Sequence, residues 1–109
     1  MRQFEIWWAS LPLPAGRRPV LLLSRNGSYS YLTKITAAEI TTRVRGLPVE
    51  VTLGRNEGLS APCVATMDNI RPVPVAALTE KIGELSVSRH RIVKRALGHA
   101  LDWDELRGL

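Results

Sequence analysis

Turn-forming residues interrupt the first two-thirds of this sequence at short intervals. A Pro/Gly segment covers residues 11–16, Asn26-Gly27 and Arg45-Gly46 are further turn signals, and glycines bound residues 54–58. Apart from the longer stretch between Gly27 and Arg45, these signals recur roughly every 8 to 12 residues, a spacing typical of small β sandwiches and barrels. Strands joined by such tight turns pair with their neighbours in antiparallel fashion. The spacing therefore predicts a small antiparallel β structure.

The segments between these turns are rich in apolar, β-branched and aromatic residues. Residues 20–24 form a continuous apolar run, whereas apolar and polar residues alternate along residues 47–53, which is the period of a half-buried strand. Asp68-Asn69 is consistent with a β-turn between two late strands. The expected strands cover residues 4–9, 20–24, 29–40, 47–53, 63–67 and 69–75.

The hydrophobic period changes in the last third of the chain. Residues 82–85 are expected in a short helical piece, and Ser88 is expected to cap a longer helix. The apolar residues of that helix recur at helical spacing: Ile92, Val93, Ala96, Leu97, Ala100 and Leu101. The fold class is mostly β or α+β: a small antiparallel barrel or half-barrel with a packed C-terminal helix, in a single domain of residues 1–109.

Positive charge is concentrated in the first half of the chain. The formal net charge is +5, and residues 1–55 carry eight Lys or Arg against three Glu, while residues 56–109 carry seven of each sign. A positive surplus on one part of a domain suits an anionic partner such as nucleic acid. The basic side of the C-terminal helix is most simply a solvated surface, with RNA contact or an interface as the alternative; it carries Arg89, Arg91, Lys94 and Arg95.

Two adjacent arginines, Arg17 and Arg18, precede Pro19 and the apolar run. Arg is always charged and offers a planar fork of donors that matches a phosphate, and Pro19 restricts the backbone where the loop becomes a strand. Taken alone, the motif fits either a phosphate-binding pair or two solvated loop residues.

The remaining residue types exclude several kinds of site. The single Cys63 excludes an internal disulfide and a Cys-rich zinc site, and it is expected as a small core residue on a strand. No His/Cys/Asp cluster has metal-ligand spacing, so no metal and no cofactor are expected. No apolar run approaches the roughly 18 residues that a membrane span needs, and the first residues lack a signal-peptide core. A cytoplasmic protein without membrane contact is expected.

Histidine and tryptophan positions point to packing more than to catalysis. His90 and His99 are nine residues apart in the expected helix, which places them near opposite faces, so they are expected as surface or interface residues. Trp7, Trp8 and Trp103 are expected mainly in packing. Alternation along a strand turns one of Trp7 and Trp8 away from the core, where it could stack on a base or fill a dimer interface.

The order of the motifs resembles the MazF/PemK family of toxin endoribonucleases, the toxin half of bacterial toxin–antitoxin pairs. The resemblance covers nearly the whole chain. It includes an Ile-Thr-Thr-x-Val-Arg-Gly-Leu segment that is typical of short, actinobacterial-like members. The segments that carry it are residues 5–8, 18–24, 38–48, 58–59, 67–71 and 82–86.

The resemblance implies a Src-homology-3-like barrel of the MazF/Kid/CcdB toxin type, a homodimer, and metal-independent, sequence-selective cleavage of single-stranded RNA. Attack of a ribose 2′-OH on the adjacent phosphate would leave 2′,3′-cyclic phosphate and 5′-OH ends. The family motif assigns stabilisation of the phosphorane and protonation of the leaving oxygen to Arg18. It assigns a phosphate or nucleophile contact to Thr41, and proton acceptance or ribose orientation to Asp68.

The same resemblance implies RNA contacts and a protein partner. The RNA-binding residues expected from it are Arg17, Ser24, Thr42, Arg43 and Asn69. A cognate acidic antitoxin is expected to cover the positive groove with a flexible tail. Two departures from the family pattern stand out: Thr66 occupies a position where some relatives have arginine, and the loop of residues 11–17 is short and Pro-rich.

Two alternatives from other classes remain open at this point. The same barrel type occurs in toxins that poison DNA gyrase and cut nothing, and the Arg18–Thr41 combination favours the ribonuclease over these. An inactive RNA-binding or interaction module is the second alternative, and the departure at Thr66 is compatible with it.

Overall fold

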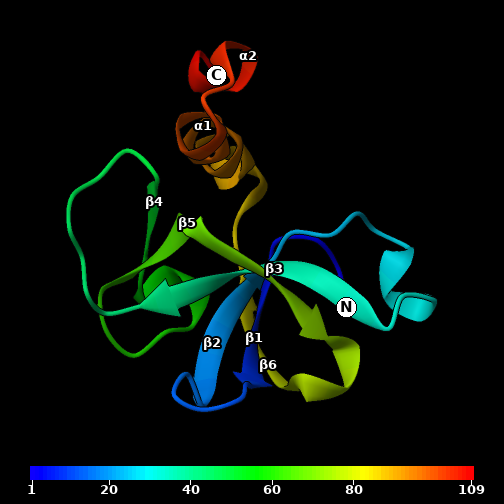
Figure 1. The fold of residues 1–109 in the computed structure, drawn as a ribbon. Helices are drawn as coiled ribbons and strands as arrows, with labels where there is room; N and C mark the ends of the chain where they lie inside the picture. Colours follow the sequence, from blue (N-terminus) through cyan, green and yellow to red (C-terminus); the bar gives the residue numbers. More distant parts are fainter.

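The computed structural model describes residues 1–109 and is built around one six-stranded antiparallel sheet (Figure 1). The strand order across the sheet is β4-β5-β3-β2-β1-β6, and every adjacent pair is antiparallel. The sheet curls into a half-barrel, which confirms the expected fold class. The strands are β1 (Glu5–Ser10), β2 (Arg17–Leu22), β3 (Lys34–Thr41), β4 (Glu50–Leu53), β5 (Cys63–Pro74) and β6 (Leu78–Glu84).

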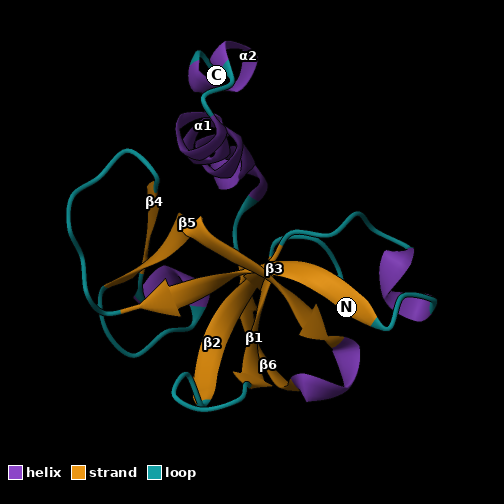
Figure 2. Ribbon diagram, viewed as in Figure 1, coloured by secondary structure: helices purple, strands orange, loops and turns teal.

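Helical structure lies at the end of the chain and beside the sheet (Figure 2). The main helix, α1 (His90–Leu101), is followed by a single turn, α2 (Asp104–Arg107), which packs on it at Gly98. Val93 and Ala96 of α1 reach into the core beside β4 and β5. None of the helices is long and apolar enough to cross a membrane.

Apolar side chains are buried on both faces of the sheet. A cluster of 14 buried residues, which includes Leu21, lies on the α1 side, and a second cluster of eight includes Val20 and Leu22. These three residues of β2 have no exposed surface. Successive strand residues point to opposite faces, so the continuous apolar run in the sequence is the signature of a central strand covered on both sides.

Several of the expected strands have different bounds in the structure. The strand expected at 20–24 is part of β2 (Arg17–Leu22), and those expected at 63–67 and 69–75 form the single strand β5 (Cys63–Pro74). The expected strand 29–40 begins only at Lys34, because residues 28–30 form a 3₁₀ turn in which the Ser28 hydroxyl donates to the carbonyl of Arg25 at 2.6 Å. Only residues 50–53 of the expected strand 47–53 are extended. Asp68-Asn69 does not form a β-turn, since β5 runs through it without interruption.

The prediction of a helical piece at residues 82–85 is wrong. Residues 82–84 belong to β6, which pairs antiparallel with β1. Backbone pairing with β1 outweighs the local pattern there. An ideal Cβ built on Gly83 would lie 2.0 Å from the carbonyl oxygen of Glu57, so β6 approaches the turn after β4 closely enough to require glycine.

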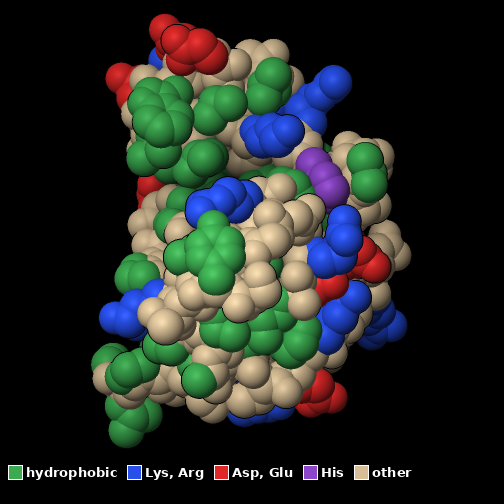
Figure 3. Space-filling model, turned by 90° about the vertical axis from the view of Figure 1, so that its right-hand side faces the viewer, with side chains coloured by type: hydrophobic (Ala, Val, Ile, Leu, Met, Phe, Trp, Pro, Cys, Tyr) green, Lys and Arg blue, Asp and Glu red, His purple; other side chains and the backbone are tan.

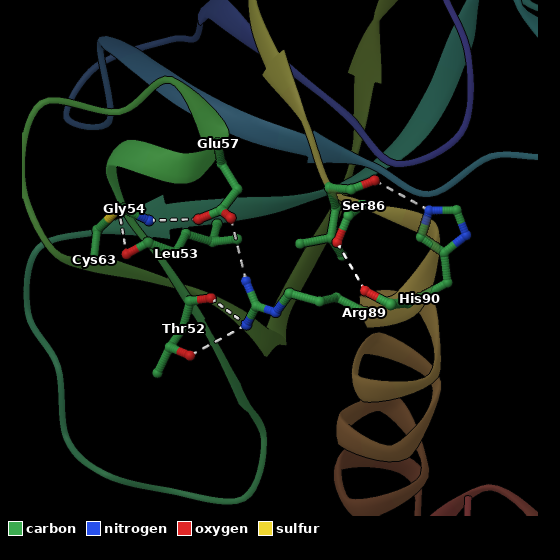
Figure 4. Close-up of polar contacts among 10 residues, drawn as sticks. Thr52, Leu53, Gly54, Glu57, Cys63, Ser86, Arg89 and His90 are labelled. Carbon is green, nitrogen blue, oxygen red and sulfur yellow. Dashed lines mark hydrogen bonds and ion pairs between the residues drawn. The ribbon is translucent and has the colours of Figure 1, made fainter.

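The start of α1 also differs from the prediction. Ser88 does not cap the helix but lies in a 3₁₀ turn, and Arg89 occupies the position before α1. The Arg89 guanidinium instead ties this corner to β4: it donates to the carbonyl of Thr52 at 2.6 Å and pairs with buried Glu57 at 3.4 Å (Figure 4). The start of α1 thus has no side-chain cap hydrogen bond, and a long-range ion pair anchors this corner to the sheet.

Aromatic and histidine positions follow the predictions only in part. Trp7 packs against the second core cluster, whereas Trp103, expected in packing, is 52% exposed between α1 and α2. His99 is exposed as expected, but His90 is partly buried and stacks on Phe4 with ring centroids 3.9 Å apart. The histidines share no site, and Cys63 is buried at the start of β5 as expected.

Replacing Gly83 by alanine tests the close approach between β6 and the turn after β4. We expect Gly83→Ala to lower the free energy of unfolding by about 1–3 kcal/mol, because backbone must shift to admit the new methyl group. Urea unfolding measures this change. Gly54→Ala is the matched control, since a Cβ at Gly54 meets nothing within 4 Å, and its effect should stay within about 0.5 kcal/mol. Equal effects of the two variants would contradict the packing argument.

Candidate functional site

A hollow at one end of the sheet gathers basic, hydroxyl and acidic side chains. We call it the polar hollow, and its cavity volume is about 290 Å³. It brings together three residues expected to be catalytic and two expected to bind RNA, from β2, β3, β5 and the loop after β3. Its lining residues are Arg18, Thr41, Arg43, Arg45, Leu47, Glu50, Thr66, Asp68 and Asn69.

Strand register places Arg18 beside Thr41. Val20 of β2 pairs with Glu39 of β3, and continuing this antiparallel register sets Arg18 opposite Thr41. A slip of one residue would exchange the side chains of β2 between two core clusters that are each closely packed around the present ones, so packing specifies this register. The side chain of Arg18 is 34% exposed, so its guanidinium is accessible from the hollow.

An irregularity in β5 carries Asp68 and Asn69 into the polar hollow. Ala38 of β3 pairs with Ile70, but Ile40 pairs with Ala65, so residues 66–69 lie opposite the single residue Glu39. Such bulges redirect side chains and are frequent beside functional sites. The hydroxyl of Thr66 accepts the backbone N–H of Asp68 at 3.3 Å and thereby helps to shape the bulge.

The Thr41 hydroxyl is oriented by the backbone. The N–H of Arg43 donates to Thr41 Oγ1 at 3.1 Å. A hydroxyl has one donor and two acceptor positions. Thr41 therefore keeps its O–H proton for an acceptor in the hollow, such as a phosphoryl oxygen.

Glu50 orders the arginine-bearing loop between β3 and β4. Its carboxylate accepts the backbone N–H groups of Arg45, Gly46 and Leu47 at 2.8–3.2 Å. Desolvation raises the pKa of Glu50, but the hydrogen bonds from Leu47, Arg45 and Gly46 outweigh it, so the pKa lies below its ordinary value. A carboxylate held in this way is a poor proton acceptor. Asp68, which is exposed and takes part in no ion pair, is the better candidate.

A second hollow lies on the other side of Arg18 and Thr41. We call it the Trp8 hollow; its volume is about 440 Å³, and Thr42 and Arg17 line it. The Arg17 guanidinium lies 3.9 Å over the Trp8 ring, a cation–π contact. Trp8 is thus the member of the tryptophan pair that faces away from the core. Burial, followed by the charge of Glu57, raises the pKa of the Cys63 thiol at the base of this hollow, so Cys63 is no activated nucleophile.

Not every expected RNA-binding residue reaches these hollows. Ser24 lies beyond the far end of β2, where its hydroxyl accepts the backbone N–H of Thr36 at 2.8 Å. Ser24 lines neither the polar hollow nor the Trp8 hollow.

Sequence reasoning missed Glu39, a buried carboxylate directly behind the polar hollow. Its oxygens lie 3.5 Å from Arg18 Nη1 and 3.2 Å from Arg71 Nη1. The available signal was an acidic residue between apolar neighbours in an expected strand, since a buried charge requires a partner. The structure has no group of three or more His, Cys, Asp or Glu side chains that could hold a metal ion.

Basic side chains outside the hollows are spread over the surface. On the face drawn in Figure 3, Lys and Arg lie from the helices down to the base of the sheet, and acidic side chains lie both at the end that carries α2 and lower down beside basic ones. Arg91, Lys94 and Arg95 on α1 are exposed to solvent.

The curled sheet, its C-terminal helix and the basic hollow define the class of this protein. It is a Src-homology-3-like half-barrel of the toxin type. The family comparison is more specific. A model described as the PemK-like, MazF-like toxin of type II toxin–antitoxin systems matches residues 2–101, and the chain belongs to this family.

Individual relatives agree with this assignment. Endoribonuclease MazF3 of Mycobacterium tuberculosis is 42% identical over 87 residues, which cover 80% of this chain and 84% of the relative. Probable endoribonuclease MazF5 of the same organism is 34% identical over 90% of both chains. Among solved structures, Mycobacterium tuberculosis toxin MazF-mt6 matches with a TM-score of 0.86 and 40% identity, over 92% of this chain and 98% of that one.

Replacing Glu50 by glutamine tests its role in the loop. We expect Glu50→Gln to accelerate hydrogen exchange at the amides of Arg45, Gly46 and Leu47, because the charged acceptor is lost. Since the folded-state pKa is lowered, the stabilisation is complete above the ordinary Glu value of 4.5 and disappears as the pH falls through the folded value. Acidification should therefore lower the protection of these three amides in the wild type, measured as exchange rates relative to the intrinsic rates at the same pH. Unchanged exchange at these amides in Glu50→Gln would refute the role.

Proposed function

We propose that this protein is a metal-independent endoribonuclease toxin that cleaves single-stranded RNA and is neutralised by a cognate antitoxin. The observation that carries the proposal is the polar hollow, in which Arg18, Thr41 and Asp68 meet from three different strands. Family membership and relatives named as endoribonucleases support it.

The proposed reaction is an internal transesterification. The ribose 2′ oxygen bonds to the adjacent phosphorus, the bond from phosphorus to the 5′ oxygen breaks, and the 5′ oxygen leaves as a hydroxyl. Asp68 accepts the proton of the 2′-OH. Arg18 donates hydrogen bonds to the phosphorane oxygens and Thr41 donates one more, which stabilises the charge that develops in the transition state. Arg18 also passes a proton to the leaving 5′ oxygen and recovers it from water. The products carry 2′,3′-cyclic phosphate and 5′-OH ends.

The remaining basic and hydroxyl residues bind the RNA on either side of the reacting phosphate. Arg43 and Asn69 bind RNA in the polar hollow, and Arg17 and Thr42 bind it in the Trp8 hollow. An acidic antitoxin would compete for the same positive surface. The proposal further includes a homodimer and a cytoplasmic location, where the RNA substrate is found.

Replacing Arg18 by alanine tests the central role in this proposal. Purified wild type should cleave mixed-sequence single-stranded RNA in EDTA, and Arg18→Ala should be slower by about 10²–10³-fold, as for loss of one preorganised donor to a transition-state oxyanion. Mapping of cut ends by their phosphate chemistry identifies the products. Lys94→Ala removes an equal charge from the exposed face of α1 and should leave the rate unchanged.

Each outcome of this experiment separates the candidate classes. RNA that stays intact with the wild type both in EDTA and with added Mg²⁺ would reject the ribonuclease and favour a gyrase poison or an inactive binding module. Cleavage that is abolished by EDTA would reject the metal-independent mechanism. Cleavage that survives in Arg18→Ala would reject the assigned role of Arg18.

The adjacent threonines offer an internally matched pair. Thr41 lines both hollows, whereas Thr42 lines only the Trp8 hollow. Thr41→Val keeps the shape but removes a hydrogen bond to a charged group, so we expect the single-turnover rate to fall about tenfold to a hundredfold. Thr42→Val should alter RNA affinity while the rate at saturating RNA stays near that of the wild type. Equal losses of rate in both variants would contradict the placement of the reaction in the polar hollow.

A further inference from the structure

The Glu39 carboxylate has an unusual set of partners for a buried charge. Its side chain is 9% exposed, and its partners are the guanidinium groups of Arg18 and Arg71. The other buried glutamates also accept backbone N–H groups: Glu5 accepts from Arg2, and Glu57 from Gly54. Glu39 has no such backbone donor, so its burial depends on the two arginines.

Burial of an ion pair is weak evidence for a role in stability. The cost of removing charges from water often equals or exceeds their mutual attraction. Glu39 lies in β3 opposite Val20, in the middle of the sheet, where an apolar residue would pack at lower cost. A carboxylate retained at this position therefore points to a function that depends on its charge and on the arginines it contacts.

The location of Glu39 fits a role in orienting the guanidinium group of Arg18. It lies opposite the bulge of β5, and it lines neither the polar hollow nor the Trp8 hollow. The carboxylate thus lies behind Arg18 and forms no part of the lining of either hollow. It approaches Nη1 of Arg18, and the other N–H donors of this guanidinium stay available for a phosphate.

The charges of Glu39, Arg18 and Arg71 also fit this role. One carboxylate between two guanidinium groups leaves a net charge of +1. Arg71 offsets the Glu39 charge from β5, so Arg18 keeps an effective positive charge while its direction is restrained. An arginine without this anchor would bind phosphate in many orientations, and only a few of these would suit the transition state.

We propose that Glu39 is a positioning residue for Arg18, and that Arg71 completes the device by balancing its charge. This inference rests on the proposed ribonuclease function, because the orientation of Arg18 matters for the reacting phosphate. It predicts that the loss of Glu39 separates RNA binding from RNA cleavage.

The test compares Glu39→Gln with the wild type in three measurements. The single-turnover cleavage rate should fall about 10²-fold, as expected when a catalytic group is misplaced by about 1 Å. Affinity for an RNA of the same sequence with 2′-O-methyl groups throughout should be unchanged or higher, because a negative charge beside Arg18 is lost. The Nε–H order parameter of Arg18, measured by NMR relaxation, should drop.

Control variants keep this test decisive. Glu84→Gln, an exposed glutamate of β6, should change none of the three measurements. Glu39→Asp retains the charge with a shorter reach, so its rate should lie between those of the wild type and Glu39→Gln. It also serves as the test variant if Glu39→Gln does not fold.

Two results would overturn the proposal. An Arg18 side chain that is equally rigid in the wild type and the Glu39 variant would remove the positioning role. If the cleavage rate, the RNA affinity and the thermal stability of the Glu39 variant all fall together, the role of Glu39 is a general structural one. If the wild type cleaves no RNA, the proposed function fails, while the order parameter of Arg18 still decides whether Glu39 holds it.

Discussion

Burial of β2 on both faces is the constraint on which the rest of the structure depends. Val20 and Leu22 enter one core cluster and Leu21 enters the other, and close packing in both clusters fixes the register of β2 against its neighbours. That register places the exposed start of β2 beside the end of β3. The polar side chains of the site are therefore positioned by apolar packing several residues away.

The site combines this rigid base with local irregularity. Arg18 and Thr41 lie on strands, whereas Asp68 lies in a bulge and Arg43 in a loop held by the Glu50 carboxylate. Regular strands alone would leave Asp68 paired within the sheet, away from the hollow. Extra residues in β5 and a carboxylate that binds backbone N–H groups bring acidic and basic side chains to the same opening.

The sequence was informative where local pattern and tertiary environment agree. The apolar run of β2 and the helical period of α1 predicted a small β fold with a C-terminal helix, and the motif order identified the family. Local pattern failed where long-range contacts decide. Pairing with β1 makes residues 82–84 a strand, and contacts of Arg89 with Glu57 and Thr52 anchor the start of α1, where a cap by Ser88 was expected. Glu39 was missed because its partners come from β2 and β5, which only the folded sheet brings together.

The two hollows have only Arg18 and Thr41 in common, and this separation has an evolutionary consequence. Substitutions at residues that line only the Trp8 hollow, such as Ser60 or Ala61, change its shape without touching the residues that surround Asp68. Under the proposed function, preference for a nucleotide sequence can drift while the chemistry is preserved. A lineage that duplicates such a gene could then generate paralogues with distinct targets through a few surface mutations.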